Sequence, residues 1–336
     1  MRPVADRMDD LITLTSRGLY CKPGDFYIDP WLPADTAVIT HAHGDHLRWG
    51  SKRYLCAEQG AAVTRHRLAS DSVVDTVPYR ATVLLGDVKV SFHPAGHVLG
   101  SSQIRVEHDG QVWVVSGDYK RDPDPTCAPF EPVSCDVFIS EATFALPVYR
   151  WKPTALIARE ILDWWDANRR AGIASVLHAY ALGKAQRVLA ELARLTDAPV
   201  YLHGAMMPLV EAYRRSGIDM LPTLPATVKT KAGYAGALIM APPSAASSPW
   251  IRRFGESSSG FCSGWMRVRG DRRRRGYDRG FVLSDHADWP SLLRSIRETG
   301  ARRVLLTHGY TDALCRYLCE QGIAAQSLRT EYGAEE

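Results

Sequence analysis

The sequence predicts a mixed α/β protein, and two observations support this fold class. The first 145 or so residues form a series of short apolar strands separated by turn residues. From about residue 150, amphipathic helical segments alternate with short strands, which is typical of a parallel α/β module. The length of 336 residues allows one large domain or two.

The N-terminal part is expected to consist mainly of strands. Asp109-Gly110 is the strongest hairpin signal, and Pro23-Gly24 and Gly86-Asp87 mark further turns. One helix is expected over 58–70, in "EQGAAVTRHRLAS". The expected strands lie at 10–22, 25–32, 36–41, 82–86, 88–95, 102–108, 111–117 and 134–144.

The second part begins with an amphipathic helix over 153–172, which has a proline at its start and a glycine at its end. Strands and helices then alternate up to residue 217, and a stretch rich in proline, serine and glycine follows over 241–280. The remaining elements are expected at 174–180 (strand), 181–196 (helix), 198–204 (strand), 206–217 (helix), 290–300 (helix), 301–310 (strand) and 311–322 (helix).

Composition narrows the class of protein. Seven cysteines occur without a C-x-x-C pair, which favours reduced thiols in a cytosolic protein over a disulfide framework. No run of roughly 18 apolar residues is present, and the first residues lack the apolar core of a secretion signal. We therefore expect a cytoplasmic protein with no membrane partner.

The stretch "AVITHAHGDHLRWG" (37–50) carries the strongest chemical signal. His41 and His43 are two apart after an apolar strand, so their side chains can reach one metal ion. Asp45 and His46, on the following turn, can face a second ion. Nitrogen and oxygen ligands without cysteine suit zinc, manganese or iron.

Three further residues at the ends of apolar strands can complete two metal sites: His97, Asp118 and His308. Two ions that share one carboxylate lie roughly 3.5–4 Å apart, and such a pair commonly clamps a scissile phosphate. His93 lies four residues before His97, and we interpret it as structural.

At this point the motifs resemble those of a known family. "HAHGDH" resembles the H-x-H-x-D-H signature of the metallo-β-lactamase superfamily, and "AGHVLG" selects His97 rather than His93. "FISEATF", "VLSDHADW" and "LLTHGY" resemble three motifs of its β-CASP nuclease branch. The compact length and "RGYDRGFVLSDHADW" are similar to bacterial exonucleases associated with an ATP-dependent DNA ligase.

The resemblance implies a role for each matching position. Asp118 would bridge the two ions, which would be zinc or manganese, and Asp45 would be both a ligand and a catalytic residue. His286 would act as general acid, held by Glu141, and Asp29 would orient a ligand histidine. The implied ligands are His41, His43 and His97 for the first ion, and Asp45, His46 and His308 for the second.

The resemblance also implies an αββα sandwich of two facing sheets with an inserted β-CASP α/β cap. The sandwich would comprise residues 1–150 and 280–336, and the cap residues 151–279. The implied function is a metal-dependent DNA exonuclease acting in repair, with a DNA ligase and a helicase as partners. A β-CASP ribonuclease remains the first alternative, and a small-molecule hydrolase of the superfamily is the second.

Substrate contacts are expected in the second part of the chain. His178 and Lys184 can meet a phosphate at the N-terminus of the helix that follows. The run "MRVRGDRRRRGYDRG" (266–280) has seven arginines, including Arg272, Arg273, Arg274 and Arg275, which can neutralise phosphates or form a solvated loop. Trp265 lies beside this run and can stack a base or pack in the core.

Overall fold

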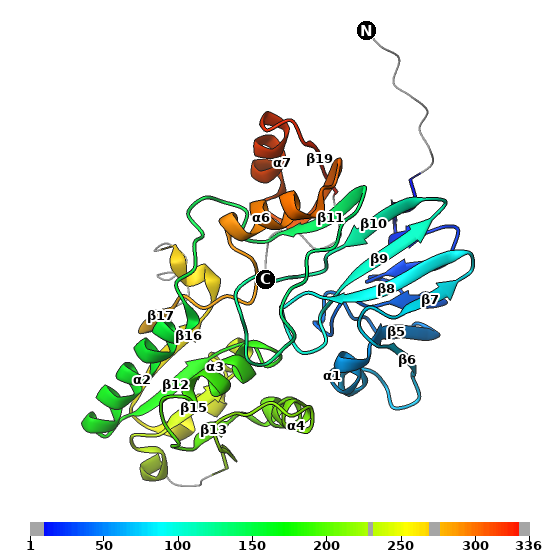
Figure 1. Ribbon diagram of the computed structural model, residues 1–336. Helices are drawn as coiled ribbons and strands as arrows, with labels where there is room; N and C mark the ends of the chain where they lie inside the picture. The colour runs from blue at the N-terminus through cyan, green and yellow to red at the C-terminus, as the bar shows by residue number, and fades with distance from the viewer. Residues whose placement is uncertain (1–9, 228–230, 269–275, 329–336) are drawn as a thin grey trace.

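The computed structural model describes residues 10–227, 231–268 and 276–328, which form a mixed α/β protein (Figure 1). Three sheets are present in these ranges. The first sheet has the order β1-β2-β3-β4-β5-β6, and β3, β4, β5 and β6 run parallel. Its strands are β1 (Ile12–Thr15), β2 (Gly18–Cys21), β3 (Phe26–Ile28), β4 (Thr36–Val38), β5 (Arg53–Ala57) and β6 (Val73–Val77).

The second sheet has the order β19-β18-β11-β10-β9-β8-β7. The hairpins β7–β8 and β9–β10 are antiparallel, whereas β10, β11, β18 and β19 are parallel. Its strands are β7 (Thr82–Leu85), β8 (Val88–Pro94), β9 (Ser102–His108), β10 (Gln111–Val115), β11 (Val137–Ala142), β18 (Arg303–Gly309) and β19 (Ala324–Ser327).

These two sheets face each other across an apolar core. Phe26, Ile28 and Val38 of the first sheet pack in one cluster with Phe92 and Ile104 of the second, and all five are fully buried. Burial of this apolar area, at about 25 cal/mol per Å², is the main favourable contribution to holding the sheets together.

Helices cover the outer faces of both sheets. α6 (Trp289–Thr299) and α7 (Thr311–Glu320) pack on the second sheet, where Leu292 and Leu314 meet Phe138. α1 (Ala61–Arg67) packs on the first sheet and α4 (Met207–Arg215) packs on α1, and Val63 and Tyr213 share a cluster with Tyr54. The two facing sheets with helices outside are the arrangement that the family resemblance implies for the sandwich.

The third sheet is entirely parallel and lies beside the other two (Figure 1). α2 (Thr154–Ala171) and α3 (Lys184–Leu192) cover one face of it, with Ile161 and Leu189 in the shared core. Its strand order is β14 (Thr223–Pro225), β13 (Val200–Leu202), β15 (Leu238–Ala241), β12 (Ala174–His178), β16 (Ser257–Cys262) and β17 (Arg279–Phe281).

The topology brings strand ends together. β10, β11 and β18 are neighbouring parallel strands, so their carboxyl ends lie at one edge of the second sheet. Ligands of open parallel sheets bind outside the carboxyl ends of the strands. Within the ranges that the structure describes, no helix is both long and apolar enough to cross a membrane.

Candidate metal centre

A histidine-rich loop, residues 39–46, follows β4 and is anchored by Asp29. This carboxylate accepts hydrogen bonds from the Thr40 backbone N–H at 2.7 Å and from the Thr40 hydroxyl. Its Oδ2 also accepts from His46 Nδ1 at 2.7 Å. Asp29 therefore fixes both the start of the loop and one of its histidines, which fits the orienting role predicted for it.

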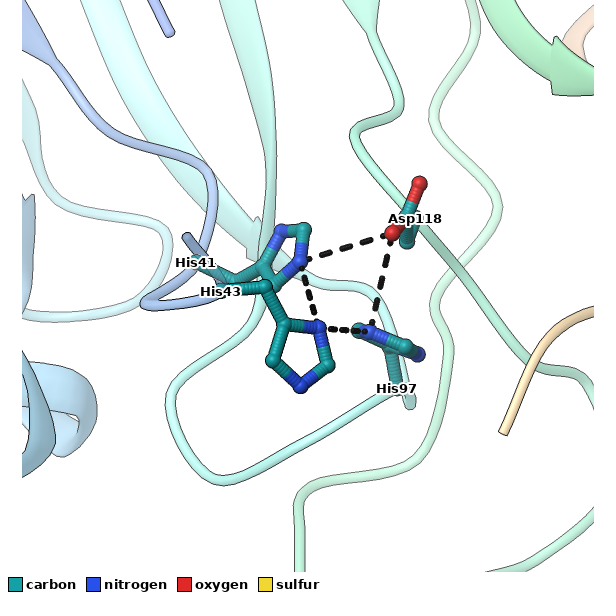
Figure 2. A group of neighbouring side chains, drawn as sticks. All are labelled: His41, His43, His97 and Asp118. Carbon is teal, nitrogen blue, oxygen red and sulfur yellow. Dashed lines mark hydrogen bonds and ion pairs between the residues drawn. The ribbon is translucent and has the colours of Figure 1, made fainter. Parts of the chain in front are cut away.

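Four predicted ligands converge at the first group (Figure 2). His43 Nδ1 lies 3.1 Å from His41 Nε2 and 3.0 Å from His97 Nε2. Asp118 Oδ2 lies 3.4 Å from His41 Nε2 and 3.7 Å from His97 Nε2. A tetrahedral ion with ligands at about 2.0–2.1 Å separates neighbouring ligand atoms by about 3.3 Å. The spacing of these four atoms fits one shared ion.

The outer nitrogens of these histidines are occupied by acceptors. His43 Nε2 donates to the Leu182 carbonyl at 3.1 Å, and His97 Nδ1 donates to the Asp285 carbonyl at 2.9 Å. Each neutral ring then carries its proton on the outer nitrogen, so the inner nitrogens of His43 and His97 face each other with lone pairs at 3.0 Å. Such a contact is repulsive unless a cation lies between the two nitrogens. The two histidines therefore fit a metal site.

The second group consists of Asp45, His46 and His308, whose ligand atoms lie within 4.8 Å of one another. His46 Nε2 lies 3.5 Å from Asp45 Oδ2 and 3.4 Å from Asp118 Oδ2. This nitrogen is buried and has no hydrogen-bond partner among the described residues. An orphaned buried nitrogen between two carboxylates fits a second cation that shares Asp118 with the first.

The electrostatics of the two groups agree with cation binding. Burial lowers the pKa of His41 and His97 well below the usual value, so both rings are neutral and available as ligands. Burial also acts on His46, but Asp118, Asp45 and Asp29 outweigh it and raise its pKa well above the usual value. An excess of negative charge around His46 thus attracts a proton, and a divalent cation can take that proton's place.

Glu141 and His286 form a third group with Asp118. His286 Nδ1 lies 2.9 Å from Glu141 Oε2, and Glu141 Oε1 accepts from the Tyr119 backbone N–H at 2.7 Å. Burial lowers the pKa of His286, but Glu141 and Asp118 outweigh this and raise it to about 9. His286 is therefore protonated at neutral pH and can donate a proton toward the pocket that it lines.

Two of the five described non-glycine residues with a positive φ belong to this site. His308 has a φ of 54° and Asp29 has a φ of 45°. This left-handed backbone conformation is one that residues other than glycine rarely adopt. Gly117 precedes Asp118, and a Cβ there would lie 2.6 Å from Thr40 Cβ. The close approach of the Asp118 segment to the histidine-rich loop therefore requires glycine at position 117.

A pocket of about 620 Å³ opens onto the metal centre. One side is formed by residues of the histidine-rich loop, such as Asp45, and by His286 and His308. The other side is formed by loops after the carboxyl ends of β12, β15 and β16, represented by Leu182, Pro243 and Trp265. The pocket thus lies between the sandwich and the third sheet.

The predicted phosphate contacts are placed differently. Lys184 lines the pocket, but its side chain is buried and its ammonium lies 2.9 Å from Asp285 Oδ2. His178 is not among the residues that line the pocket, and its ring packs on Tyr277 with a centroid distance of 5.1 Å. The structure gives neither side chain a free position for a phosphate at the start of α3. Arg272, Arg273, Arg274 and Arg275 lie outside the described residues.

Sequence reasoning missed the groups that orient the ligands from outside. The Leu182 and Asp285 carbonyls are backbone atoms, so no residue type marks them in the sequence. The Thr40 hydroxyl, which contacts both Asp29 and His41 Nδ1, lies directly before the first histidine without any pattern of its own. For Asp285, the available sequence signal was its position as the acidic neighbour of His286.

Asp29 offers a direct test of this outer layer. Replacing it with asparagine keeps the left-handed backbone but places an amide where two hydrogen bonds are accepted. We expect the affinity for the second ion to fall about 10- to 100-fold, measured by competition with a chromogenic chelator. Asp25→Asn is the matched control, because Asp25 has a φ of 50° in the preceding turn and contacts Tyr20. Equal affinities in both variants would contradict the role of Asp29.

Comparison with known proteins supports the family predicted from the motifs. The chain is 30% identical over 315 residues to a protein named "Probable DNA ligase" from Opitutus terrae, a match that covers 93% of this chain and 30% of that protein. It is 23% identical over 208 residues to an RNase J-like protein from Methanocaldococcus jannaschii, covering 53% and 49% of the two chains. It is 27% identical over 161 residues to endoribonuclease YSH1 from Saccharomyces cerevisiae, covering 47% and 20%.

The chain spans less than two thirds of the length of each of these curated relatives. Among solved structures, a protein of unknown function from Enterococcus faecalis V583 matches with a TM-score of 0.56 and 12% identity, over 90% of this chain and 80% of that one. This likeness shows a shared fold alone. No protein-family model matches the chain.

The fold and the ligand motifs resemble those of the metallo-β-lactamase superfamily. Within that superfamily the chain resembles the β-CASP nucleases, including those associated with a DNA ligase. The family resemblance predicted from the sequence is thereby confirmed.

Proposed function

We propose that the chain is a metal-dependent nuclease that hydrolyses phosphodiester bonds, with DNA ends as its preferred substrate. The observation that carries this proposal is the convergence of two ligand groups on Asp118, beside the Glu141–His286 pair and at the base of an open pocket. A site with two cations and a proton donor is suited to in-line displacement at a phosphate.

In this proposal the seven predicted ligands hold two divalent ions, zinc or manganese. His41, His43 and His97 would hold the first, Asp45, His46 and His308 would hold the second, and Asp118 would contribute to both. Bound in this way, the ions supply a nucleophile at neutral pH and neutralise charge that develops on the phosphate.

The chain's own residues do the remaining work. Glu141 accepts a hydrogen bond from His286 Nδ1, which favours the charged imidazolium. His286 then donates a proton to the departing sugar oxygen as the phosphorus–oxygen bond breaks. Because Glu141 is 1% exposed and also bonded to the Tyr119 N–H, it holds the imidazolium in one orientation.

We propose that residues 151–279, which include most of the third sheet, are the inserted β-CASP cap. The carboxyl ends of three of its parallel strands contribute to the pocket opposite the metal centre. A strand of nucleic acid entering between the two sides would meet the ligands on one and the cap loops on the other.

The relatives support two polymers. DNA is favoured by the match over 93% of this chain to a protein named as a probable DNA ligase. The same match supports a DNA ligase as a partner. The ATP dependence of that ligase, the role in repair and a helicase partner follow from the resemblance alone. RNA is the second candidate, because other relatives are named ribonucleases and endoribonucleases.

The deciding experiment is digestion of end-labelled single strands and duplexes of DNA and RNA with a panel of divalent metals. We expect progressive shortening of DNA from an end with Mn²⁺ or Zn²⁺, and none in excess chelator. Cleavage of RNA alone would exclude the DNA substrate. Hydrolysis of small esters or lactams without cleavage of any oligonucleotide would replace the nuclease by a small-molecule hydrolase.

Trp265 offers a test of single-strand binding in the pocket. Its half-buried indole lines the pocket and packs on the buried Phe144, with ring centroids 4.7 Å apart. Stacking of a base on an aromatic ring is worth about 1–3 kcal/mol, so Trp265→Ala should raise KM for a single strand roughly 5- to 150-fold. Steady-state kinetics measure this, with Trp49→Ala as control because Trp49 is 78% exposed and does not line the pocket. An unchanged KM would exclude stacking on Trp265.

A further inference from the structure

A buried ionic cluster joins α3 to the segment that leads into His286. Its members are Lys184 and Arg187 of α3 and Asp285, and each is at most 3% exposed. We call these three residues the junction. Charged groups in such a position cost free energy unless they are paired with good geometry, so their contacts define what the junction holds in place.

The side chains of Lys184 and Arg187 both contact side-chain and backbone oxygens of segment 283–285. Lys184 Nζ lies 2.9 Å from Asp285 Oδ2 and donates to the Leu283 carbonyl at 3.2 Å. Arg187 Nη1 donates to the Ser284 carbonyl at 2.8 Å and lies 3.5 Å from Asp285 Oδ1. Three consecutive residues, 283–285, are thus fixed against one face of α3.

The Arg187 guanidinium makes two further contacts. Its Nε lies 3.4 Å from Asp124 Oδ2, and its Nη2 donates to the Thr154 hydroxyl. Both Arg187 and the Asp124 side chain are almost completely buried. The guanidinium therefore connects α3, the start of α2 and the loop that follows Asp118, which leaves it little freedom to move.

The junction ends at a metal ligand. The Asp285 carbonyl accepts the hydrogen bond from His97 Nδ1 at 2.9 Å. On the other side, the turn that begins α3 supplies the Leu182 carbonyl, which accepts from His43 Nε2 at 3.1 Å. Gln186 of α3 stabilises this turn by accepting from Gly183 N at 2.7 Å and donating to the Ala181 carbonyl at 2.9 Å.

Two of the three histidines of the first group are therefore oriented by carbonyls whose positions depend on α3. Outer hydrogen bonds set the tautomer and the direction of a ligand imidazole, and their loss weakens metal binding. An apolar contact between α3 and segment 283–285 would allow sliding, whereas the paired charges fix one register between them.

We propose that the junction is a positioning device that completes the first metal site only when α3 is docked against segment 283–285. Lys184, Arg187 and Asp285 act through the carbonyls that orient His43 and His97, and they do not bind the ion or the substrate. This proposal rests on the proposed function, because it takes the group of His41, His43, His97 and Asp118 as a metal site.

The test measures ion binding without substrate. Lys184→Met keeps the length of the side chain and removes its charge, while Arg187 still pairs with Asp285. We expect the affinity for one of two ions to fall about 10- to 100-fold, with the other unchanged. Titration of the full chain with Zn²⁺ against a chromogenic chelator gives both affinities. Lys184→Arg keeps a cation within reach of Asp285 and should bind both ions as the parent does.

A control variant separates positioning from loss of stability. Leu189 lies on α3 but is completely buried in the core beneath the third sheet. Leu189→Ala should lower the thermal midpoint and leave both ion affinities unchanged at temperatures where the variant is folded. A merely structural junction predicts the same behaviour for Lys184→Met and Leu189→Ala.

Asp285→Asn is the second probe, because it keeps the carbonyl that accepts from His97 but removes the charge that holds it. If Lys184→Met does not fold, this variant decides the question by the same titration. Folded variants that bind two ions as tightly as the parent would overturn the junction and leave the nuclease proposal standing. A parent chain that binds no ions would overturn both proposals.

Discussion

Asp45→Ala is expected to abolish cleavage while leaving the fold and the binding of a nucleic acid strand largely intact. Asp45 is one of three residues in the second group, and its Oδ2 lies 3.5 Å from His46 Nε2. Its side chain is 18% exposed, so its loss does not open the core. A catalytic cation contributes several kcal/mol to transition-state stabilisation, and each 1.36 kcal/mol is tenfold. Turnover should therefore fall at least about 10³-fold.

Three measurements on the same protein establish this result. Digestion of an end-labelled strand gives turnover, elemental analysis should show one ion in place of two, and fluorescence polarisation gives strand affinity. Asp87→Ala, in the exposed turn between β7 and β8, is the matched control and should resemble the parent in all three. Full activity in Asp45→Ala with two ions bound would remove Asp45 from the ligand set.

His286→Ala is expected to slow the chemical step about 10²- to 10⁴-fold, the contribution of a general acid, with both ions retained. His286 lines the pocket and is held by Glu141 at 2.9 Å, but it belongs to neither of the groups that we assign to the ions. Its loss should therefore reduce the rate constant of the chemical step, measured in single turnover. KM from steady-state kinetics and the metal content should stay close to those of the parent.

A change of leaving group distinguishes proton donation from a structural role. In a substrate with sulfur in place of the departing sugar oxygen, the leaving group is a thiolate. A thiolate can depart without receiving a proton. His286→Ala should cleave this substrate at nearly the parental rate. A variant that is equally slow on both substrates would show that His286 does not act as the acid. Glu141→Gln should give the same selective loss, since the carboxamide no longer favours the charged imidazole.

The candidate metal centre was predictable because its residues combine rare types with informative positions. His41, His43, Asp45 and His46 lie within six positions after an apolar strand, and a strand end is where parallel sheets expose side chains. His97 and His93 have the same residue type and similar surroundings in sequence, so only the family motif separated them. In the structure His93 contacts Ser91 and Glu131 instead of the metal ligands.

Contacts made by backbone atoms and by ion pairs across the fold were not predictable in the same way. Lys184 at the start of a helix is a reasonable phosphate ligand, but its true neighbour is 101 positions away, at Asp285. No local pattern reports such a pairing. The carbonyls that orient His43 and His97 depend on the same long-range packing.

The fold shows a similar division. The expected helix over 153–172 is α2, which ends before Gly172 with a φ of 73°, because proline and glycine mark both of its ends. By contrast, β16 was not expected. Its sequence, "SSSGFC" (257–262), has low intrinsic preference for a strand, and its position between β12 and β17 imposes the extended conformation.

His308 lies on β18, which pairs with β11 only after the whole third sheet has been passed along the chain. A ribosome adds residues in order, so a nascent chain that stops before β18 carries the histidine-rich loop but not the last imidazole of the second group. Under the proposed function, the full set of ligands therefore assembles only after β18 has been synthesised.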